Sequence, residues 1–138
     1  MEKVFVDTGG WVALFGANDA NHRSAMGVYE HLKKIKGLLY TSDYIIDETI
    51  TLTLARANHA QSAALGRALF ESALVDIIPV APDYLQASWE WYQKYKDKQF
   101  SFTDVTTLVI AKALGIRKVF GYDREFEKVG MELLKESP

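Results

Sequence analysis

Short apolar runs alternate with longer helix-like segments along this chain, and that order constrains the fold more than any other feature. The apolar runs are nearly continuous, as strands covered on both faces tend to be. They cover residues 3–7, 37–41, 75–80, 118–121 and 131–134, and helical segments are expected at 10–15, 20–36, 43–57, 61–74, 82–96 and 103–114. This alternation predicts an α/β fold in which helices cross over between the strands of a parallel sheet.

Length and composition are those of an ordinary globular protein. The chain has 138 residues, of which 49% are hydrophobic and 25% charged, and we expect residues 1–138 to form one domain. Cysteine is absent, which excludes a disulfide framework and a thiolate metal site. No apolar run approaches the ~18 residues of a membrane span, and the first residues lead straight into a strand rather than a signal peptide. These features favour a cytoplasmic protein.

The net charge argues against a protein that coats nucleic acid nonspecifically. It is −2, with a pI near 5.9, whereas such proteins show a broad basic surface. A nuclease is still compatible with this charge, because a bound metal and a local basic rim can offset an acidic site.

Acidic residues recur at the junctions where a predicted strand ends and a helix begins, or in the first turns of that helix. They are Asp7, Glu48, Asp104 and Asp123. A parallel sheet gathers the carboxyl ends of its strands at one edge, where ligands bind. Carboxylates that converge there would repel one another and resist ionising together. A divalent cation would relieve that repulsion, and ligands that are all oxygen indicate Mg²⁺ or Mn²⁺.

Each acid except Glu48 also has a purely local interpretation. Aspartate is a preferred N-cap residue, which would account for Asp7 and Asp123. Asp104 follows Ser101 at the spacing of a capping box, and Asp43 is expected to cap the helix that it begins. Separate caps do not explain why four acids fall at the same edge, so we favour the shared site while the local interpretations stay open.

Glu48 is a better candidate ligand than its neighbour Asp47. Helical spacing places Glu48 in an apolar stripe with Tyr44 and Leu52, and places Asp47 on a different side, beside Thr51. A carboxylate inside an apolar stripe is costly to bury without a partner. The partner that we expect for Glu48 is the cation.

Further polar residues are candidates for supporting roles. The Thr8 hydroxyl could bond a neighbouring carboxylate, and Thr107, one turn beyond Asp104, could hold a water near the metal. Arg23, Arg56 and Arg124 are candidates for contact with phosphate.

The segments VFVDTGGWVALF, TSDYIIDETITL and FSFTDVTTLVIAKALGIRKVFGYDREF resemble the PIN domain family, and within it the VapC-like toxin ribonucleases. The resemblance implies a three-layer α/β/α fold with a five-stranded parallel sheet. It also implies an endonuclease site that depends on Mg²⁺ or Mn²⁺, frequent homodimers, and inhibition by an antitoxin protein. The positions that match the four acids of the family are Asp7, Glu48, Asp104 and Asp123, and those that match its accessory polar residues are Thr8 and Thr107.

The expected function is therefore a metal-dependent endoribonuclease that hydrolyses RNA, as the toxin of a toxin–antitoxin pair. Two alternatives stay open: a nuclease of RNA processing on the same fold, and a non-catalytic module that binds RNA or protein. A phospho-receiver domain is rejected, because the third strand ends in Ile78-Pro79-Val80 without a carboxylate. A homodimer is expected, since the aromatic segment 89–95 and the helical segment 61–74 offer more apolar surface than one small sheet covers.

Overall fold

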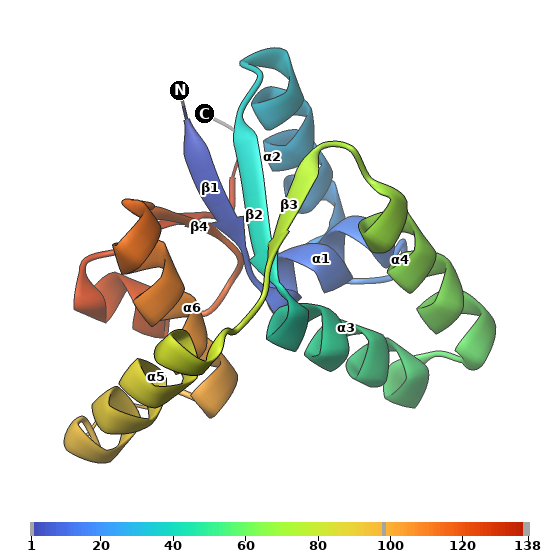
Figure 1. Cartoon of the computed structure of the whole chain (residues 1–138). Helices are drawn as coiled ribbons and strands as arrows, with labels where there is room; N and C mark the ends of the chain where they lie inside the picture. The colour runs from blue at the N-terminus through green and yellow to red at the C-terminus, as the bar shows by residue number, and fades with distance from the viewer. Residues whose placement is uncertain (1, 98, 137–138) are drawn as a thin grey trace.

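Five parallel strands form a single sheet at the centre of the molecule (Figure 1). The structure is a computed structural model and describes residues 2–97 and 99–136. The strands are β1 (Lys3–Val6), β2 (Leu38–Ser42), β3 (Val75–Ile78), β4 (Lys118–Phe120) and β5 (Glu132–Leu134), in the spatial order β3-β2-β1-β4-β5. Every strand expected from the sequence is present, and all four pairings are parallel.

Helices cover both faces of the sheet. They are α1 (Thr8–Phe15), α2 (His22–Lys34), α3 (Asp43–Arg56), α4 (His59–Glu71), α5 (Pro82–Lys94) and α6 (Phe102–Leu114), followed by the short 3-10 helix η1 (Arg124–Val129). In Figure 1, α1, α3 and α4 lie on one side of the strands and α5 and α6 on the other. This is the three-layer α/β/α architecture that the sequence predicts.

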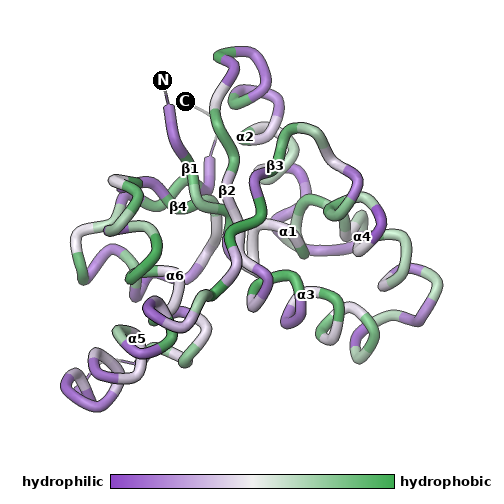
Figure 2. The backbone as a smooth tube through the Cα atoms, in the orientation of Figure 1, coloured by the Kyte–Doolittle hydropathy of each residue, from purple (hydrophilic) through white to green (hydrophobic). Residues whose placement is uncertain are grey.

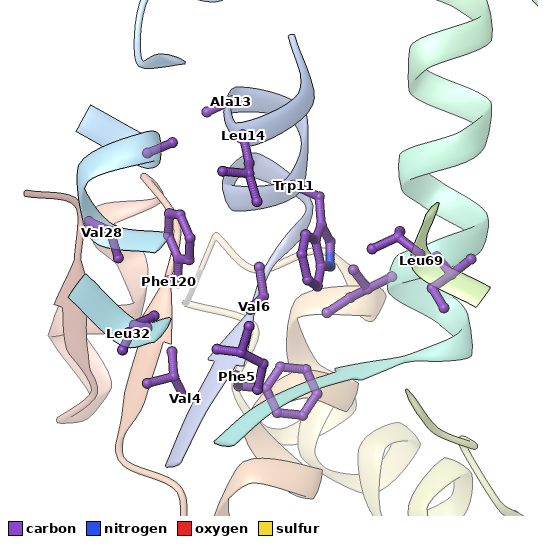
Figure 3. Close-up of a cluster of buried hydrophobic side chains, with 14 of the residues drawn as sticks. Val4, Phe5, Val6, Trp11, Ala13, Leu14, Val28, Leu32, Leu69 and Phe120 are labelled. Carbon is purple, nitrogen blue, oxygen red and sulfur yellow. The ribbon is translucent and has the colours of Figure 1, made fainter. Parts of the chain in front are cut away.

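The core explains why the strands are nearly continuous in hydrophobicity. Val4, Phe5 and Val6 of β1 are completely buried, so both faces of the central strand are covered. The larger cluster packs these residues against Trp11 and the other side chains drawn in Figure 3. A second cluster lies under α6 and η1 and is built from Phe100, Val105, Leu108, Val119 and Phe126. Figure 2 shows the hydrophobic stretches along the central strands.

Helix boundaries follow local chemistry. Gly16 and Gly115 follow the ends of α1 and α6 as the sequence predicts, and Gly115 has the left-handed φ of 70° that glycine adopts most easily. The expected N-cap of α3 was wrong: Ser42, not Asp43, accepts the hydrogen bond from the Ile45 amide. The Asp43 carboxylate instead accepts from the Val80 amide, which ties the exit of β3 to the start of α3.

The carboxyl ends of β1 and β4 are held together closely. Val6 pairs with Phe120, and the Asp7 amide donates to the Phe120 carbonyl at 3.0 Å. Helix α1 then starts against β4: a Cβ at Gly10 would lie 2.5 Å from the Phe120 carbonyl oxygen. Glycine is therefore required at position 10 for α1 to begin beside this strand.

Several aromatic and aliphatic side chains of α4 and α5 are exposed, as the sequence predicts for an apolar outer surface. Phe70 is 64% exposed, Trp89 49% and Tyr92 42%. No helix within the described ranges combines the length and the apolar character needed to cross a membrane.

Candidate active site

Asp7 lies at the centre of the carboxyl edge, between β1 and α1. Its side chain is only 6% exposed. It occupies the N-cap position of α1 but makes no side-chain cap hydrogen bond, and its Oδ1 is buried without a hydrogen-bond partner. The capping interpretation therefore fails for Asp7. A buried carboxylate oxygen without a partner is costly, and this cost points to a ligand that the oxygen binds.

Glu48 reaches the same edge from the second turn of α3. Its Oε1 accepts a hydrogen bond of 2.6 Å from the Thr8 hydroxyl, directly after Asp7. Glu48 shares its side of α3 with Tyr44 and Leu52, as expected, but this stripe lines an open groove and is not buried. Asp47 and Thr51 line the same groove, so Asp47 does not point to a different side as predicted. Glu48 is half-buried and tied to Thr8, whereas Asp47 is exposed.

Asp104 and Asp123 complete the cluster while also capping helices. The Ser101 and Asp104 side chains form the predicted capping box at the start of α6, with Asp104 Oδ2 accepting from the Ser101 amide. Asp123 Oδ1 accepts from the Glu125 amide at the start of η1. In both carboxylates a backbone amide donates to one oxygen, and a carboxylate has further lone pairs that can bind a ligand. The local and the functional interpretations are therefore compatible at these two positions.

The charges of neighbouring acids perturb Asp7 and Asp104. The pKa of Asp7 is raised from 3.8 to about 7, chiefly by burial and also by the charges of Asp104, Glu48 and Asp123, against an opposing hydrogen bond from the Thr8 amide. Burial likewise raises the pKa of Asp104 to about 6, with contributions from the charges of Asp123 and Glu48. Perturbed acids of this kind mark functional sites more often than structural ones.

The donor set fits a hard divalent cation. All four groups are carboxylates, and carboxylate oxygens are the ligands that Mg²⁺ and Mn²⁺ prefer. Within residues 2–97 and 99–136, no three His, Cys, Asp or Glu side chains are drawn together closely enough to chelate an ion as they stand. A cation with several retained waters does not require such a closed cage. The unpartnered Asp7 oxygen and the mutual repulsion of the acids are the features that a positive ion would offset.

The structure places the other residues predicted from the sequence in different surroundings. Thr107 is fully buried and donates to the Thr103 carbonyl, so its proton is used within α6. Arg124 is exposed and follows Asp123 directly, and Arg23 is exposed near the start of α2. Arg56 is not brought to the acids: it lies in the last turn of α3 and lines a different hollow, with Phe15 and Gln61.

Sequence reasoning did not identify two contacts that shape the site. A Cβ at Gly121 would lie 3.1 Å from the Asp7 Cβ and 3.5 Å from its Oδ2, so Gly121 leaves the space in which the Asp7 carboxylate sits. The Tyr122 hydroxyl is 2.7 Å from the Ser24 hydroxyl and so links the loop before Asp123 to α2. The glycine between β4 and Asp123 was a visible signal, whereas the pairing of Tyr122 with Ser24 depends on tertiary structure.

Fold and site together define a parallel α/β protein with a cluster of carboxylates at the carboxyl edge of its sheet. The model of one family, the PIN domain, matches residues 4–131. The chain belongs to the PIN domain family, as the sequence resemblance indicates.

Relatives of this chain include VapC ribonucleases. The 23S rRNA-specific endonuclease VapC20 of Mycobacterium tuberculosis (strain ATCC 25618 / H37Rv) is 30% identical over 127 residues, which cover 92% of this chain and 94% of the relative. The VapC ribonuclease of Archaeoglobus fulgidus is 28% identical over 88% of this chain and 77% of the relative. The chain is thus VapC-like.

Solved structures agree with this assignment. The crystal structure of Mycobacterium tuberculosis VapC20, described as a Sarcin-Ricin loop cleaving toxin, superposes with a TM-score of 0.83 at 30% identity, over 93% of this chain and 95% of that chain. The VapBC2 structure from Rickettsia felis, bound to a DNA fragment from its promoter, has a TM-score of 0.70 at 13% identity over 95% and 96% of the two chains. At that identity the second match shows the fold alone.

Proposed function

We propose that this chain is an endoribonuclease that uses Mg²⁺ or Mn²⁺ to hydrolyse RNA phosphodiester bonds, and that it is the toxin of a toxin–antitoxin pair. The observation that carries the proposal is Asp7: a buried carboxylate with one unpartnered oxygen and a pKa raised to about 7 by burial and by three neighbouring acids. A protein that only needed a stable fold would gain by replacing such a group. A nuclease needs it to hold positive charge beside the scissile phosphate.

The carboxylates of Asp7, Glu48, Asp104 and Asp123 are the proposed ligands. When bound, the cation supplies positive charge to the scissile phosphate and acidifies a water for in-line attack. The protein supplies the orientation of the ligands. Thr8 donates to one oxygen of Glu48, and backbone amides donate to one oxygen each of Asp104 and Asp123, which restricts how each carboxylate is oriented.

Ribosomal RNA is the proposed substrate class. The VapC20 relative is a 23S rRNA-specific endonuclease, and its similarity extends over most of both chains. Arg124, which follows Asp123, and Arg23, in the first turn of α2, are exposed, and both are proposed to contact phosphates. Because the substrate is RNA, a cytoplasmic location is proposed.

The proposed partners are an antitoxin protein and a second copy of this chain, and residues 1–138 are proposed to form one domain. Solved structures with the same fold are described as VapBC complexes, and this supports the proposal of an antitoxin partner. A small gene adjacent to this one, whose product binds this chain and blocks cleavage, would favour a toxin over a nuclease of RNA processing.

The proposal is tested on purified ribosomes and on deproteinised ribosomal RNA. The wild-type protein with Mn²⁺ is expected to cut the large-subunit RNA at one or a few positions, mapped by primer extension, and Asp104→Asn is expected to cut roughly 100-fold or more slowly. Circular dichroism of the variant checks that the fold is retained. Equal cleavage by the variant, or no cleavage of any RNA, would refute the proposed function.

A further inference from the structure

A groove beside the acid cluster lies along one face of α3. It has a volume of about 420 Å³, within the range of small-ligand sites. The α3 residues that line it recur at helical spacing and therefore form a single stripe, which includes Tyr44, Asp47, Glu48, Thr51 and Leu52. Thr103, at the start of α6, also lines the groove. Glu48 belongs both to this groove and to the acid cluster. A substrate phosphate at the acids therefore places an adjoining nucleotide at the groove.

We propose that this groove holds a nucleobase of the RNA next to the scissile phosphate, with Tyr44 as the stacking surface and Asp47 as the hydrogen-bond acceptor that selects the base. The inference rests on the proposed ribonuclease function and adds a specificity site to it. Neither residue belongs to the metal-binding set.

Tyr44 has the properties of a stacking residue. It is half-exposed, it is not among the described side chains that pack in or against either hydrophobic cluster, and its hydroxyl makes no hydrogen bond to the described part of the protein. It lies one helical turn, ~6 Å along the axis, before Glu48. Single-stranded RNA is commonly recognised by stacking of splayed-out bases on aromatic side chains.

The charge of the groove favours a base over the phosphate backbone. No lysine, arginine or histidine is among the described residues that line it, whereas Asp47 and Glu48 are both acidic. Phosphates would be repelled at this surface. A base edge that carries an amino group is complementary, because a carboxylate only accepts hydrogen bonds.

Asp47 is the acceptor that remains available. Glu48 is bonded to Thr8 and acts in the acid cluster, whereas Asp47 is exposed and forms no hydrogen bond or ion pair with the described part of the protein. Adenine, cytosine and guanine each carry an exocyclic amino group that can donate to it. Uracil has only its N3–H, flanked by two carbonyl oxygens that a carboxylate repels, so uracil is the base that this groove disfavours.

The test uses a pool of RNAs that carry the mapped ribosomal cut site, with the positions next to the cut randomised, and these are cleaved with Mn²⁺ and sequenced. Wild-type protein is expected to show uracil depleted roughly tenfold at one position adjoining the cut. Asp47→Asn offers both a donor and an acceptor, so the depletion should disappear. Tyr44→Ala should raise KM roughly tenfold while kcat changes less, and Tyr44→Phe should restore KM.

Matched controls separate these effects from charge, fold and assembly. Asp76→Asn removes an exposed carboxylate on β3, and Leu54→Ala removes an exposed side chain of α3 that does not line the groove. Both are expected to keep the wild-type base profile. If the Asp47 and Tyr44 variants keep it too, or if Tyr44→Ala changes the mass in light scattering and not the profile, the base site is refuted. Absence of metal-dependent cleavage by the wild type would instead refute the proposed function itself.

Discussion

Replacing Asp7 by asparagine is expected to stabilise the metal-free protein at neutral and alkaline pH. The pKa of Asp7 rises from 3.8 to about 7 on folding. At about 1.36 kcal/mol per pKa unit, ionised Asp7 therefore lowers the free energy of unfolding by at most about 4 kcal/mol. The asparagine amide brings N–H groups that need partners, at a cost of about 1–3 kcal/mol. The expected net gain above pH 7 is therefore about 1–3 kcal/mol.

The sign of this effect should depend on pH. The pKa of Asp7 is higher in the folded than in the unfolded state, so the native protein binds the extra proton between about pH 4 and pH 7. The free energy of unfolding of the wild type should therefore fall as pH rises through that interval, with Asp104 adding to the slope up to about pH 6. The asparagine side chain cannot ionise, so the Asp7→Asn variant should show a flatter curve and no advantage at pH 4.

Urea and thermal unfolding in EDTA at several pH values between 4 and 8 measure both effects. At pH 8 the melting temperature of Asp7→Asn is expected to exceed that of the wild type by roughly 3–10 °C. Asp76→Asn, which removes an exposed aspartate, should change stability by less than about 0.5 kcal/mol. Two curves that stay parallel from pH 4 to pH 8 would show that Asp7 is not the strained carboxylate described above.

Other perturbations probe the remaining parts of the site. Glu48→Gln should weaken Mn²⁺ binding in calorimetric titration more than Asp47→Asn does, because only Glu48 is tied to Thr8 and perturbs Asp7; equal losses would refute this assignment. Gly121→Ala should displace the Asp7 carboxylate and weaken Mn²⁺ binding by roughly tenfold or more. The matched control is Gly9→Ala, where a Cβ meets nothing closer than 3.7 Å. Equal Mn²⁺ affinities of the two variants would show that Gly121 does not make room for the Asp7 carboxylate. Light scattering at micromolar concentration should give about twice the 15.6 kDa chain mass, and a monomer mass would contradict the proposed dimer.

The sequence predicts the sheet well because hydrophobic periodicity and glycine punctuation are local signals. The continuous runs around Val4 and Val119 became buried parallel strands, and Gly115 ended α6 where expected. The four acids could be predicted to meet because parallel strands bring their carboxyl ends together, and the raised pKa of Asp7, to which the charges of the other three acids contribute, agrees with that expectation.

The features of the site that could not be predicted depend on how α3 is oriented in the fold and on tertiary contacts. Helical phase placed Glu48 in an apolar stripe, but nothing local shows that this stripe borders a groove that Asp47 shares. Arg56 was a reasonable phosphate contact by composition, yet its place in the last turn of α3 carries it to another hollow. The space that Gly121 leaves for Asp7 exists only because β1 and β4 are neighbours.

Metal dependence of RNA cleavage tests the central claim most directly. Protein treated with EDTA and dialysed is assayed on ribosomal RNA without metal, with Mg²⁺, with Mn²⁺ and with Ca²⁺, and Asp7→Asn prepared in parallel reports any contaminating ribonuclease. Cleavage is expected only with Mg²⁺ or Mn²⁺, and Ca²⁺ is expected to compete without supporting it, since it prefers more ligands at longer distances. Cleavage by the wild type that persists in EDTA and is absent from Asp7→Asn would contradict the role of the four carboxylates as a metal site.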